Sequence, residues 1–351
     1  MRIHRLLLPV FLSFLRTIIG GGVFPLRMPE VRPTRNEVYL CSAVEIGTKG
    51  RYWVRGFKPV VIPGTMHHMA VVGCSRYPPV TPANVWNCGS NGNPVLEPGF
   101  PALNTTCSAG DMKSMTLFLW SRNGETYILP KDVGFAIGGD SPVQHLVLQV
   151  HYINVQHLPE HGDISGVDIL YTDTEPLRTA GMMSVHVNTN VPSFSKTYQD
   201  GGCRIGENKI LHPFSYLVHT HALGQVVSVW RVRRGGLVRG KDDWTLIGKK
   251  SPLKPQSFYP VEDKDLQLQP DDNIAIRCTM LNLKRKDVKQ GLASYDEMCD
   301  VYIMYWVYGN HSNLLQGEVA CHADGPPAVT WRSFGFNNIP DLEASSLDVD
   351  N

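Results

Sequence analysis

Short apolar stretches that alternate with polar residues recur along most of the chain. Seven of them are rich in β-branched and aromatic residues: 37–46, 51–62, 115–120, 146–154, 225–234, 273–280 and 300–308. Alternation with a period of two is typical of strands that bury one face. Clusters of Gly, Pro, Asn and Asp separate these stretches, and we find no helical period beyond the N-terminal segment. The pattern predicts an all-β fold, most simply β-sandwiches.

The N-terminal segment follows a different pattern. Arg2 and Arg5 precede an apolar run from Leu6 to Leu15. A basic start followed by about ten apolar residues is typical of a secretory signal peptide, and the run is short for a transmembrane helix. We therefore predict a signal peptide over residues 1–24, with an uncleaved signal anchor as the alternative. The mature protein is then expected in the secretory granule lumen or outside the cell, without stable membrane insertion.

Composition bounds the remaining possibilities. The 351 residues are 42% hydrophobic and 19% charged, which is typical of a globular chain with room for two domains. The formal net charge of +1 gives no reason to expect nucleic acid or an anionic membrane surface as a partner. We expect a monomer.

The cysteines agree with an oxidising compartment. Their even number and the absence of any CxxC motif favour disulfides over zinc. They form two groups of four on either side of a long gap: Cys41, Cys74, Cys88 and Cys107, then Cys203, Cys278, Cys299 and Cys321. If each group closes its own pairs, the chain has two disulfide-stapled domains, with a boundary near residues 175–178. Asn104 and Asn310 lie in glycosylation sequons.

Two histidine pairs could bind metal. In a strand, residues i and i+2 point to the same face, so His219 and His221 would present two imidazoles side by side, although an exposed polar strand face explains the pattern equally well. His67 and His68 are neighbours and face opposite ways on a flat strand. Both could reach one metal only at a twisted or looped position, which the preceding Pro63 and Gly64 make plausible.

His151 and Met298 are less distinctive. By itself His151 reads as a core histidine on an apolar strand, and Met298, beside Cys299, reads as core filler. As a ligand, however, a thioether favours copper, and imidazole also suits copper. One set of three histidines and another of two histidines with a methionine would form redox-active copper sites. Spacing alone does not assign these sets.

Five motifs in a fixed order point to one family. They are MHHM…VGC, LQVHY, HTHALG, WTLIGKKSPLKPQSFYPVE and DEMCDVYIMYW. Together they closely resemble the copper type II, ascorbate-dependent monooxygenases, and within them the peptidylglycine α-hydroxylating branch. The resemblance spans residues 36–335 and implies two jelly-roll-like antiparallel β-sandwich domains, 36–175 and 178–335, each carrying one copper. An acidic tail, 336–351, follows and is expected to be a loose end.

The resemblance also implies roles for individual residues. The electron-transfer copper is expected on His67, His68 and His151, and the oxygen-binding copper on His219, His221 and Met298. Gln149 matches a family glutamine that helps to couple the two sites. The implied disulfides are Cys41–Cys88, Cys74–Cys107, Cys203–Cys321 and Cys278–Cys299.

The implied reaction uses two copper ions, ascorbate as reductant and O₂ as co-substrate. It hydroxylates the α-carbon of the C-terminal glycine of a peptide, the first step of peptide C-terminal amidation in neuropeptide processing. We expect glycine-extended peptides as substrates. No lyase domain follows residue 335, so a separate lyase would complete amidation.

The expected carboxylate anchor departs from the family. Leu217 stands where the family has an arginine and Asp300 where it has an asparagine, while Tyr302 matches. Three hypotheses follow: a peptide hydroxylase that uses another anchor, such as Arg231 or Arg233; a related monooxygenase that hydroxylates an amine paired with Asp300; or a copper-binding protein with little turnover.

Overall fold

Strands dominate the architecture. The computed structural model describes residues 20–76, 84–89, 95–108, 114–121, 124–235, 240–309 and 320–347. Within these ranges the helical elements are the 3-10 turn η1 (Val155–His157) and the short helix α1 (Asp341–Ala344). The all-β prediction is confirmed. Nothing helical in the described part of the chain has both the length and the apolar character that a membrane crossing requires.

The first half of the chain folds into two facing sheets. One has the order β1–β10–β3–β8: Gly22–Arg27, Gly166–Thr172, Arg51–Val60 and Val133–Gly138, with β7 (Tyr127–Ile128) beside β3. The other has the order β5–β2–β9–β4–β6: Val85–Asn87, Val38–Glu45, His145–Tyr152, Met66–Cys74 and Met115–Ser121. The strand pairings within these two sheets are antiparallel.

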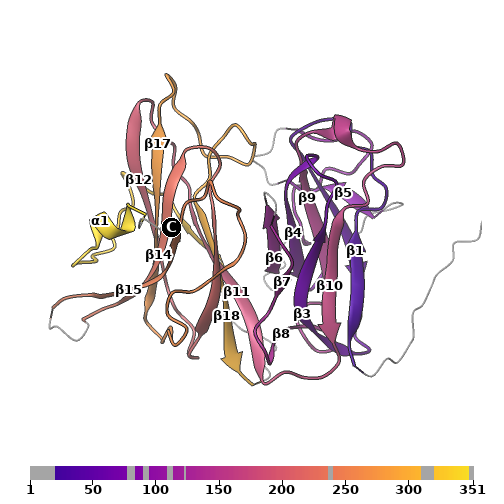
Figure 1. The fold of residues 1–351 in the computed structure, drawn as a ribbon, viewed down its shortest axis with the longest axis horizontal. Helices are drawn as coiled ribbons and strands as arrows, with labels where there is room; N and C mark the ends of the chain where they lie inside the picture. The colour runs from indigo at the N-terminus through magenta and orange to yellow at the C-terminus, as the bar shows by residue number, and fades with distance from the viewer. Residues whose placement is uncertain are drawn as a thin grey trace, which may run out of the picture.

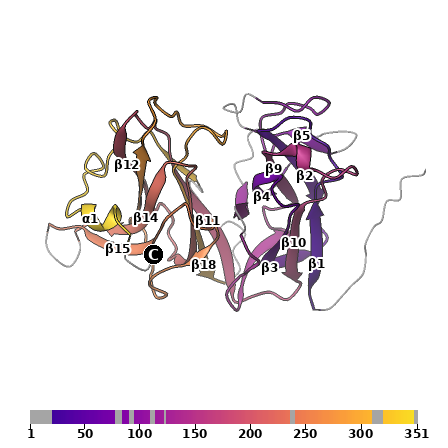
Figure 2. The same cartoon turned by 45° about the horizontal axis from the view of Figure 1, so that its top comes forward.

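The second half repeats this plan. One sheet has the order β11–β18–β13–β16: Arg178–Val187, Asp300–Tyr308, His212–His219 and Tyr259–Pro260, with β19 (Ala320–Ala323) parallel to β11. The other has the order β12–β17–β14–β15: Ser195–Arg204, Asn273–Asn282, Gly224–Arg233 and Asp243–Lys250. Figures 1 and 2 show the two halves side by side, and β11 runs between them.

Strand pairing and apolar packing both join the halves. β11 pairs in parallel with β8 over Arg178 and Thr179, so one hydrogen-bonded sheet continues from the first half into the second. An apolar cluster also crosses the boundary, because buried Leu217 and Phe258 of the second half belong to the same core as Phe118 of the first. The buried apolar surface therefore holds the two sandwiches face to face.

The four disulfides are present in the pairing that the family resemblance implied. They join Cys41 to Cys88, Cys74 to Cys107, Cys203 to Cys321 and Cys278 to Cys299. Two lie within each half. The last one ties β17 to the residue that follows Met298, and so anchors the chain directly beside this methionine.

Both ends of the chain differ from expectation. The predicted signal peptide ends at residue 24, but β1 begins at Gly22 and pairs with β10 from that residue onward. Residues 1–19 lie outside the described residues. The acidic tail is not loose over residues 336–347, because Phe336 and Ala344 are buried against Trp331. The expectation failed because a few apolar residues within the acidic stretch suffice to dock it.

A buried ion pair lies beneath this tail. Arg277 on β17 donates from Nε and Nη2 to the two oxygens of Asp200 on β12, at 2.6 and 3.0 Å. The guanidinium also lies over Trp331, 4.2 Å from the ring centroid, and Trp331 N–H donates to Asp200. Both charged side chains are 6% exposed, so each depends on the other for compensation.

Replacing Arg277 with leucine should therefore destabilise the fold. Breaking a buried pair leaves an uncompensated charge, and we expect the free energy of unfolding to fall by about 3–5 kcal/mol in urea titrations. Adding Asp200→Asn to that variant should restore part of the loss. Arg204→Leu is the matched control, since Arg204 and its partner Asp271 are 69% and 73% exposed; its effect should stay within about 0.5 kcal/mol. An equal effect of both arginine variants would contradict this account.

Candidate metal centre between the two halves

The first ligand set lies on two neighbouring strands of the first half. His67 and His68 are in β4, and His151 lies opposite His68 on β9. The pairing of β4 with β9 shifts register between Met66 and His68, which marks a β-bulge. The bulge is the distortion that two adjacent histidines need in order to approach a common point. One ring nitrogen from each of the three lies within 4.8 Å of those of the other two.

The protonation of this set suits metal binding. Burial and the neighbouring histidines hold the pKa of His68 well below its ordinary value, and burial also lowers that of His151. Both rings are therefore neutral at pH 7, the form in which imidazole binds a metal. Their Nδ1 atoms are buried and have no hydrogen-bond partner among the described residues. Buried polar atoms normally have one, so these are the atoms that can bind a metal.

Tyr39 on β2 and Glu37, just before this strand, hold the His151 ring. Tyr39 stacks on it with ring centroids 4.1 Å apart and planes inclined by 11°. Glu37 accepts a hydrogen bond from His151 Nε2 at 3.0 Å. Burial would raise the pKa of Glu37, but hydrogen bonds from His151 and Ser294 outweigh it and lower the pKa to about 2. Glu37 is thus a carboxylate, and it orients His151 so that Nδ1 is the free nitrogen.

The second set begins where β13 ends. His219 is the last residue of that strand, and His221 lies two residues beyond it. His221 is therefore not on the strand as expected, but its ring still lies beside that of His219, with the two centroids 5.2 Å apart. Gln256 accepts a hydrogen bond from His219 Nδ1 at 2.6 Å, and the carbonyl of Asp296 accepts one from His221 Nδ1 at 3.1 Å. His221 Nε2 is buried without a partner among the described residues.

Glu297 joins the second set to its methionine. Its carboxylate accepts hydrogen bonds from the backbone N–H groups of His221, of Leu223 at 2.8 Å and of Met298 at 3.0 Å. One buried side chain thereby fixes two loop segments that are far apart in the sequence. Neither Glu297 nor Gln256 is among the residues expected at the site from the sequence, although Gln256 lies in the motif WTLIGKKSPLKPQSFYPVE and Glu297 in DEMCDVYIMYW.

The two sets meet at the boundary between the halves. The ring centroid of His67 lies 5.3 Å from that of His221 and 6.1 Å from that of His219. The centroid of His68 lies 6.0 Å from that of His219. The five imidazoles therefore form one cluster, to which each half of the chain contributes.

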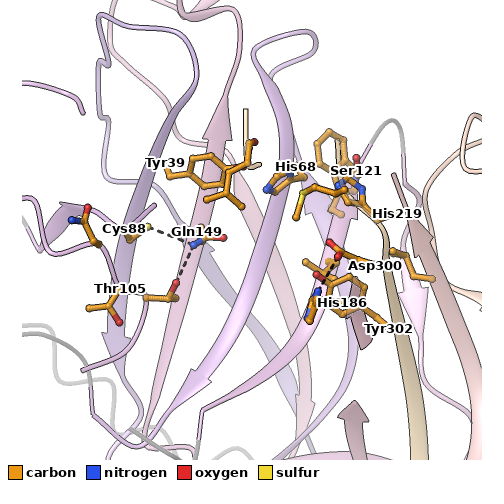
Figure 3. Close-up of a pocket in the computed structure, with 17 residues that line it drawn as sticks. Tyr39, His68, Cys88, Thr105, Ser121, Gln149, His186, His219, Asp300 and Tyr302 are labelled. Carbon is orange, nitrogen blue, oxygen red and sulfur yellow. Dashed lines mark hydrogen bonds and ion pairs between the residues drawn. The ribbon is translucent and has the colours of Figure 1, made fainter. Parts of the chain in front are cut away.

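A cavity of about 460 Å³ opens beside this cluster. It is lined from both halves, by Gln149 and His68 of the first and by Met298 and His219 of the second. Figure 3 shows Gln149, His68 and His219 among the lining side chains. Gln149 Nε2 donates to Thr106 Oγ1 at 2.9 Å. Leu217, Asp300 and Tyr302, the residues expected near the substrate, also line it.

The polar end of the cavity is a pair of charged groups. His186 on β11 lies directly across from Asp300 on β18, and His186 Nδ1 donates to Asp300 Oδ1 at 2.9 Å (Figure 3). Burial opposes both charges, but mutual attraction raises the pKa of His186 and lowers that of Asp300. His186 Nε2 is 2.9 Å from Ser184 Oγ, so both ring nitrogens are engaged. Asp300 Oδ2 is buried without a partner among the described residues.

No arginine or lysine is among the described residues that line the cavity. Leu217 is 2% exposed and belongs to the apolar core between the halves. The suggestion that Arg231 or Arg233 replaces the missing arginine is wrong. Both lie on β14 in the other sheet, where they bind Asp243 and Asp272.

The donor atoms suit copper. The cluster offers imidazole nitrogens, and Met298 of the cavity lining offers a thioether, which together form a set that favours copper over calcium or magnesium. One ring nitrogen of His151, of His219 and of His221 is held by Glu37, Gln256 and the Asp296 carbonyl respectively, as expected for metal-binding histidines. Of the two sequons, Asn104 is an exposed residue at the cavity, while Asn310 lies outside the described residues.

Gln256→Ala should loosen the second ligand set. Besides orienting His219, the Gln256 amide donates to the carbonyls of Thr220 and Pro252 at 3.0 and 2.9 Å. Loss of such outer contacts typically weakens metal affinity about 10–100-fold. Competition with a copper chelator measures this, and Gln267→Ala, at an exposed position, is the control. Equal copper retention in the two variants would contradict the proposed role of Gln256.

Profiles of a known family match both halves. That of the copper type II ascorbate-dependent monooxygenase N-terminal domain matches residues 24–159, and that of the C-terminal domain of the same enzymes matches residues 178–334. A chain from the structure of infectious bursal disease virus Gx strain aligns over 81% of this chain and 76% of that one, at 11% identity. The TM-score of 0.24 is too low to indicate a shared fold.

Curated relatives agree with these profiles. The chain is 34% identical over 327 residues to peptidyl-glycine alpha-amidating monooxygenase B of Xenopus laevis, covering 92% of this chain and 33% of that protein. It is 35% identical over 291 residues to the Mus musculus peptidyl-glycine alpha-amidating monooxygenase, covering 82% and 27%. DBH-like monooxygenase protein 1 of Homo sapiens is 24% identical over 298 residues, covering 78% and 45%. The chain thus spans about a third of the first two relatives, and it belongs to the copper type II, ascorbate-dependent monooxygenase family.

Proposed function

We propose that the protein hydroxylates the α-carbon of a C-terminal glycine in peptides, the first step of C-terminal amidation. The observation that carries this proposal is the meeting of the two ligand sets at one cavity, with one ring nitrogen of His151, His219 and His221 already engaged. Identity of 34–35% to peptidyl-glycine alpha-amidating monooxygenases supports the choice of substrate.

Each ligand set has its own proposed role. His67, His68 and His151 would hold one copper, and His219, His221 and Met298 a second. Copper, when bound, supplies reversible one-electron chemistry and a site at which O₂ is activated, with ascorbate as reductant. The protein positions the substrate beside the second set and buries His67, His151, His219 and His221, while His68 and Met298 are partly exposed. Because burial and Asp300 raise the pKa of Tyr302 well above its ordinary value, its hydroxyl stays a hydrogen-bond donor.

The location, oligomeric state and partners of the protein are also proposals. We infer a secretory-pathway protein, in granules or outside the cell, which acts as a monomer on glycine-extended peptides. A separate lyase would convert the hydroxyglycine product to the peptide amide.

A second function is favoured by one observation. Asp300 Oδ2 is a buried acceptor without a partner among the described residues. The described residues that line the cavity with Asp300 include no arginine or lysine. An acceptor of this kind is satisfied by a donor, such as an ammonium group or an amide N–H, and repels a carboxylate. A related hydroxylation of an amine is therefore the alternative, and the 24% identity to DBH-like proteins is compatible with it.

An assay that supplies candidate substrates one at a time separates these functions. The chain lacking residues 1–19, so that β1 stays intact, is loaded with copper and given ascorbate, O₂ and one of three compounds. These are a glycine-ended peptide, the same peptide as its C-terminal amide, and an aryl-ethylamine. We expect gain of one oxygen, measured by mass spectrometry, on the free-acid peptide. Oxygenation of the amine or the amide alone would favour the second function, and copper binding without any product would leave a copper-binding protein with little turnover.

Asp300→Asn should improve binding of the free-acid peptide. The asparagine can still accept from His186 Nδ1, while its amide N–H₂ replaces the repelling Oδ2 at the cavity. A hydrogen bond to a charged group is worth about 1.5–3 kcal/mol, so KM for the free acid should fall about tenfold or more. Asp265→Asn, at an exposed position, is the control. A rise in KM, with an unchanged melting temperature, would mean that Asp300 itself binds the substrate.

A further inference from the structure

One loop of the second half reaches the first half beside His151. This crossing loop, residues 291–296, places Ser294 against Glu37: Ser294 N donates to Glu37 Oε2 at 2.9 Å and Ser294 Oγ donates to Oε1 at 2.6 Å. Next to this contact, Tyr39 donates from its hydroxyl to the carbonyl of Leu292 at 2.8 Å. The two residues that hold the His151 ring are thus the two that the crossing loop binds.

The other end of the crossing loop supports the second ligand set. The carbonyl of Asp296 accepts from His221 Nδ1 at 3.1 Å, and Met298 follows two residues later. A single short loop therefore contacts the support of a ligand in the first set and a ligand of the second. Any movement of the halves apart would pull the loop away from Glu37.

The backbone of Glu37 has an uncommon conformation. Its φ is +62°, a left-handed conformation that is uncommon for a residue with a side chain. Its N–H donates to the carbonyl of Tyr152 at 2.8 Å, which holds it there. Such conformations persist where the surroundings over-determine them, and they gather at functional positions.

The carboxylate connects the two contacts through one atom. Glu37 Oε2 accepts from both Ser294 N and His151 Nε2. The bond to Nε2 selects the imidazole tautomer in which Nδ1 carries the free lone pair. The two Ser294 donors fix the carboxylate plane, and hence the direction in which the His151 ring is held.

We propose that Glu37 is a positioning residue that couples contact between the two halves to the orientation of His151, with Ser294 as its partner from the second half. The inference rests on the copper role proposed for His151. Through Glu37, electron supply at the first set depends on the arrangement in which both sets face the same cavity. When the halves separate, Glu37 loses both Ser294 donors and His151 loses its fixed direction.

Variants at Ser294 test the coupling from the opposite half. Ser294→Ala removes the hydroxyl contact, Ser294→Thr keeps it, and Ser193→Ala is a matched change at a serine whose hydroxyl is not part of the contact. Glu37→Gln removes the charge and leaves a single acceptor oxygen for three donors. Hydrogen–deuterium exchange of the metal-free chain reports the contact directly, because the Ser294 amide donates to Glu37. We expect faster exchange over residues 291–296 in Ser294→Ala and Glu37→Gln only.

Copper alone, added to the metal-free protein, gives the second readout. In chelator competition we expect Glu37→Gln to lose one copper at about 10–100-fold lower chelator concentration, and Ser294→Ala at about three- to tenfold lower. Both should alter the Cu(II) hyperfine splitting in the electron paramagnetic resonance spectrum, whereas Ser294→Thr should match the parent. If Ser294→Ala matches Ser193→Ala in both copper readouts, the coupling is overturned. A parent chain that binds no copper would overturn the proposed function instead, and the exchange data would still decide whether the contact exists.

Discussion

The site depends on contact between the inner faces of two sandwiches. One set of histidines lies on β4 and β9 of the first half, and the other lies at the end of β13 in the second. Neither half contains both sets, and the apolar cluster around Phe118, Leu217 and Phe258 is what keeps them together. Because this contact is made of non-directional apolar packing, its geometry has to be refined by polar contacts at the rim.

Those polar contacts explain why so many charged and polar groups are buried here. Glu37 and Glu297 each accept several hydrogen bonds, whereas Gln256 accepts one and donates two, and each of the three touches a histidine of the cluster or the backbone beside one. Burying a carboxylate is unfavourable unless it is fully hydrogen-bonded. A fully hydrogen-bonded carboxylate has few alternative orientations, and the histidines that it contacts are held rigidly as a result. The disulfide between Cys278 and Cys299 adds covalent restraint beside Met298.

The cavity shows where this chain departs from the pattern of its family. Leu217 has joined the apolar core, and Asp300 is engaged by His186 from the neighbouring strand. The polar end of the cavity thus contains a charged pair with one open acceptor, in place of a cationic anchor. Such a change leaves the two proposed ligand sets untouched and alters what the site can recognise.

The sequence by itself determined seven of the strands, because period-two alternation reports directly on which face of a strand is buried. It also indicated the ligand types, since imidazole and thioether are identifiable chemical groups, and the resemblance to a family assigned them to sets and paired the cysteines. Only the tertiary structure revealed Glu37, Ser294 and Gln256 as supporting residues, placed Arg231 and Arg233 in the wrong sheet for an anchor, and docked the acidic tail. These outcomes depend on contacts between residues as many as 257 positions apart, which no local pattern encodes.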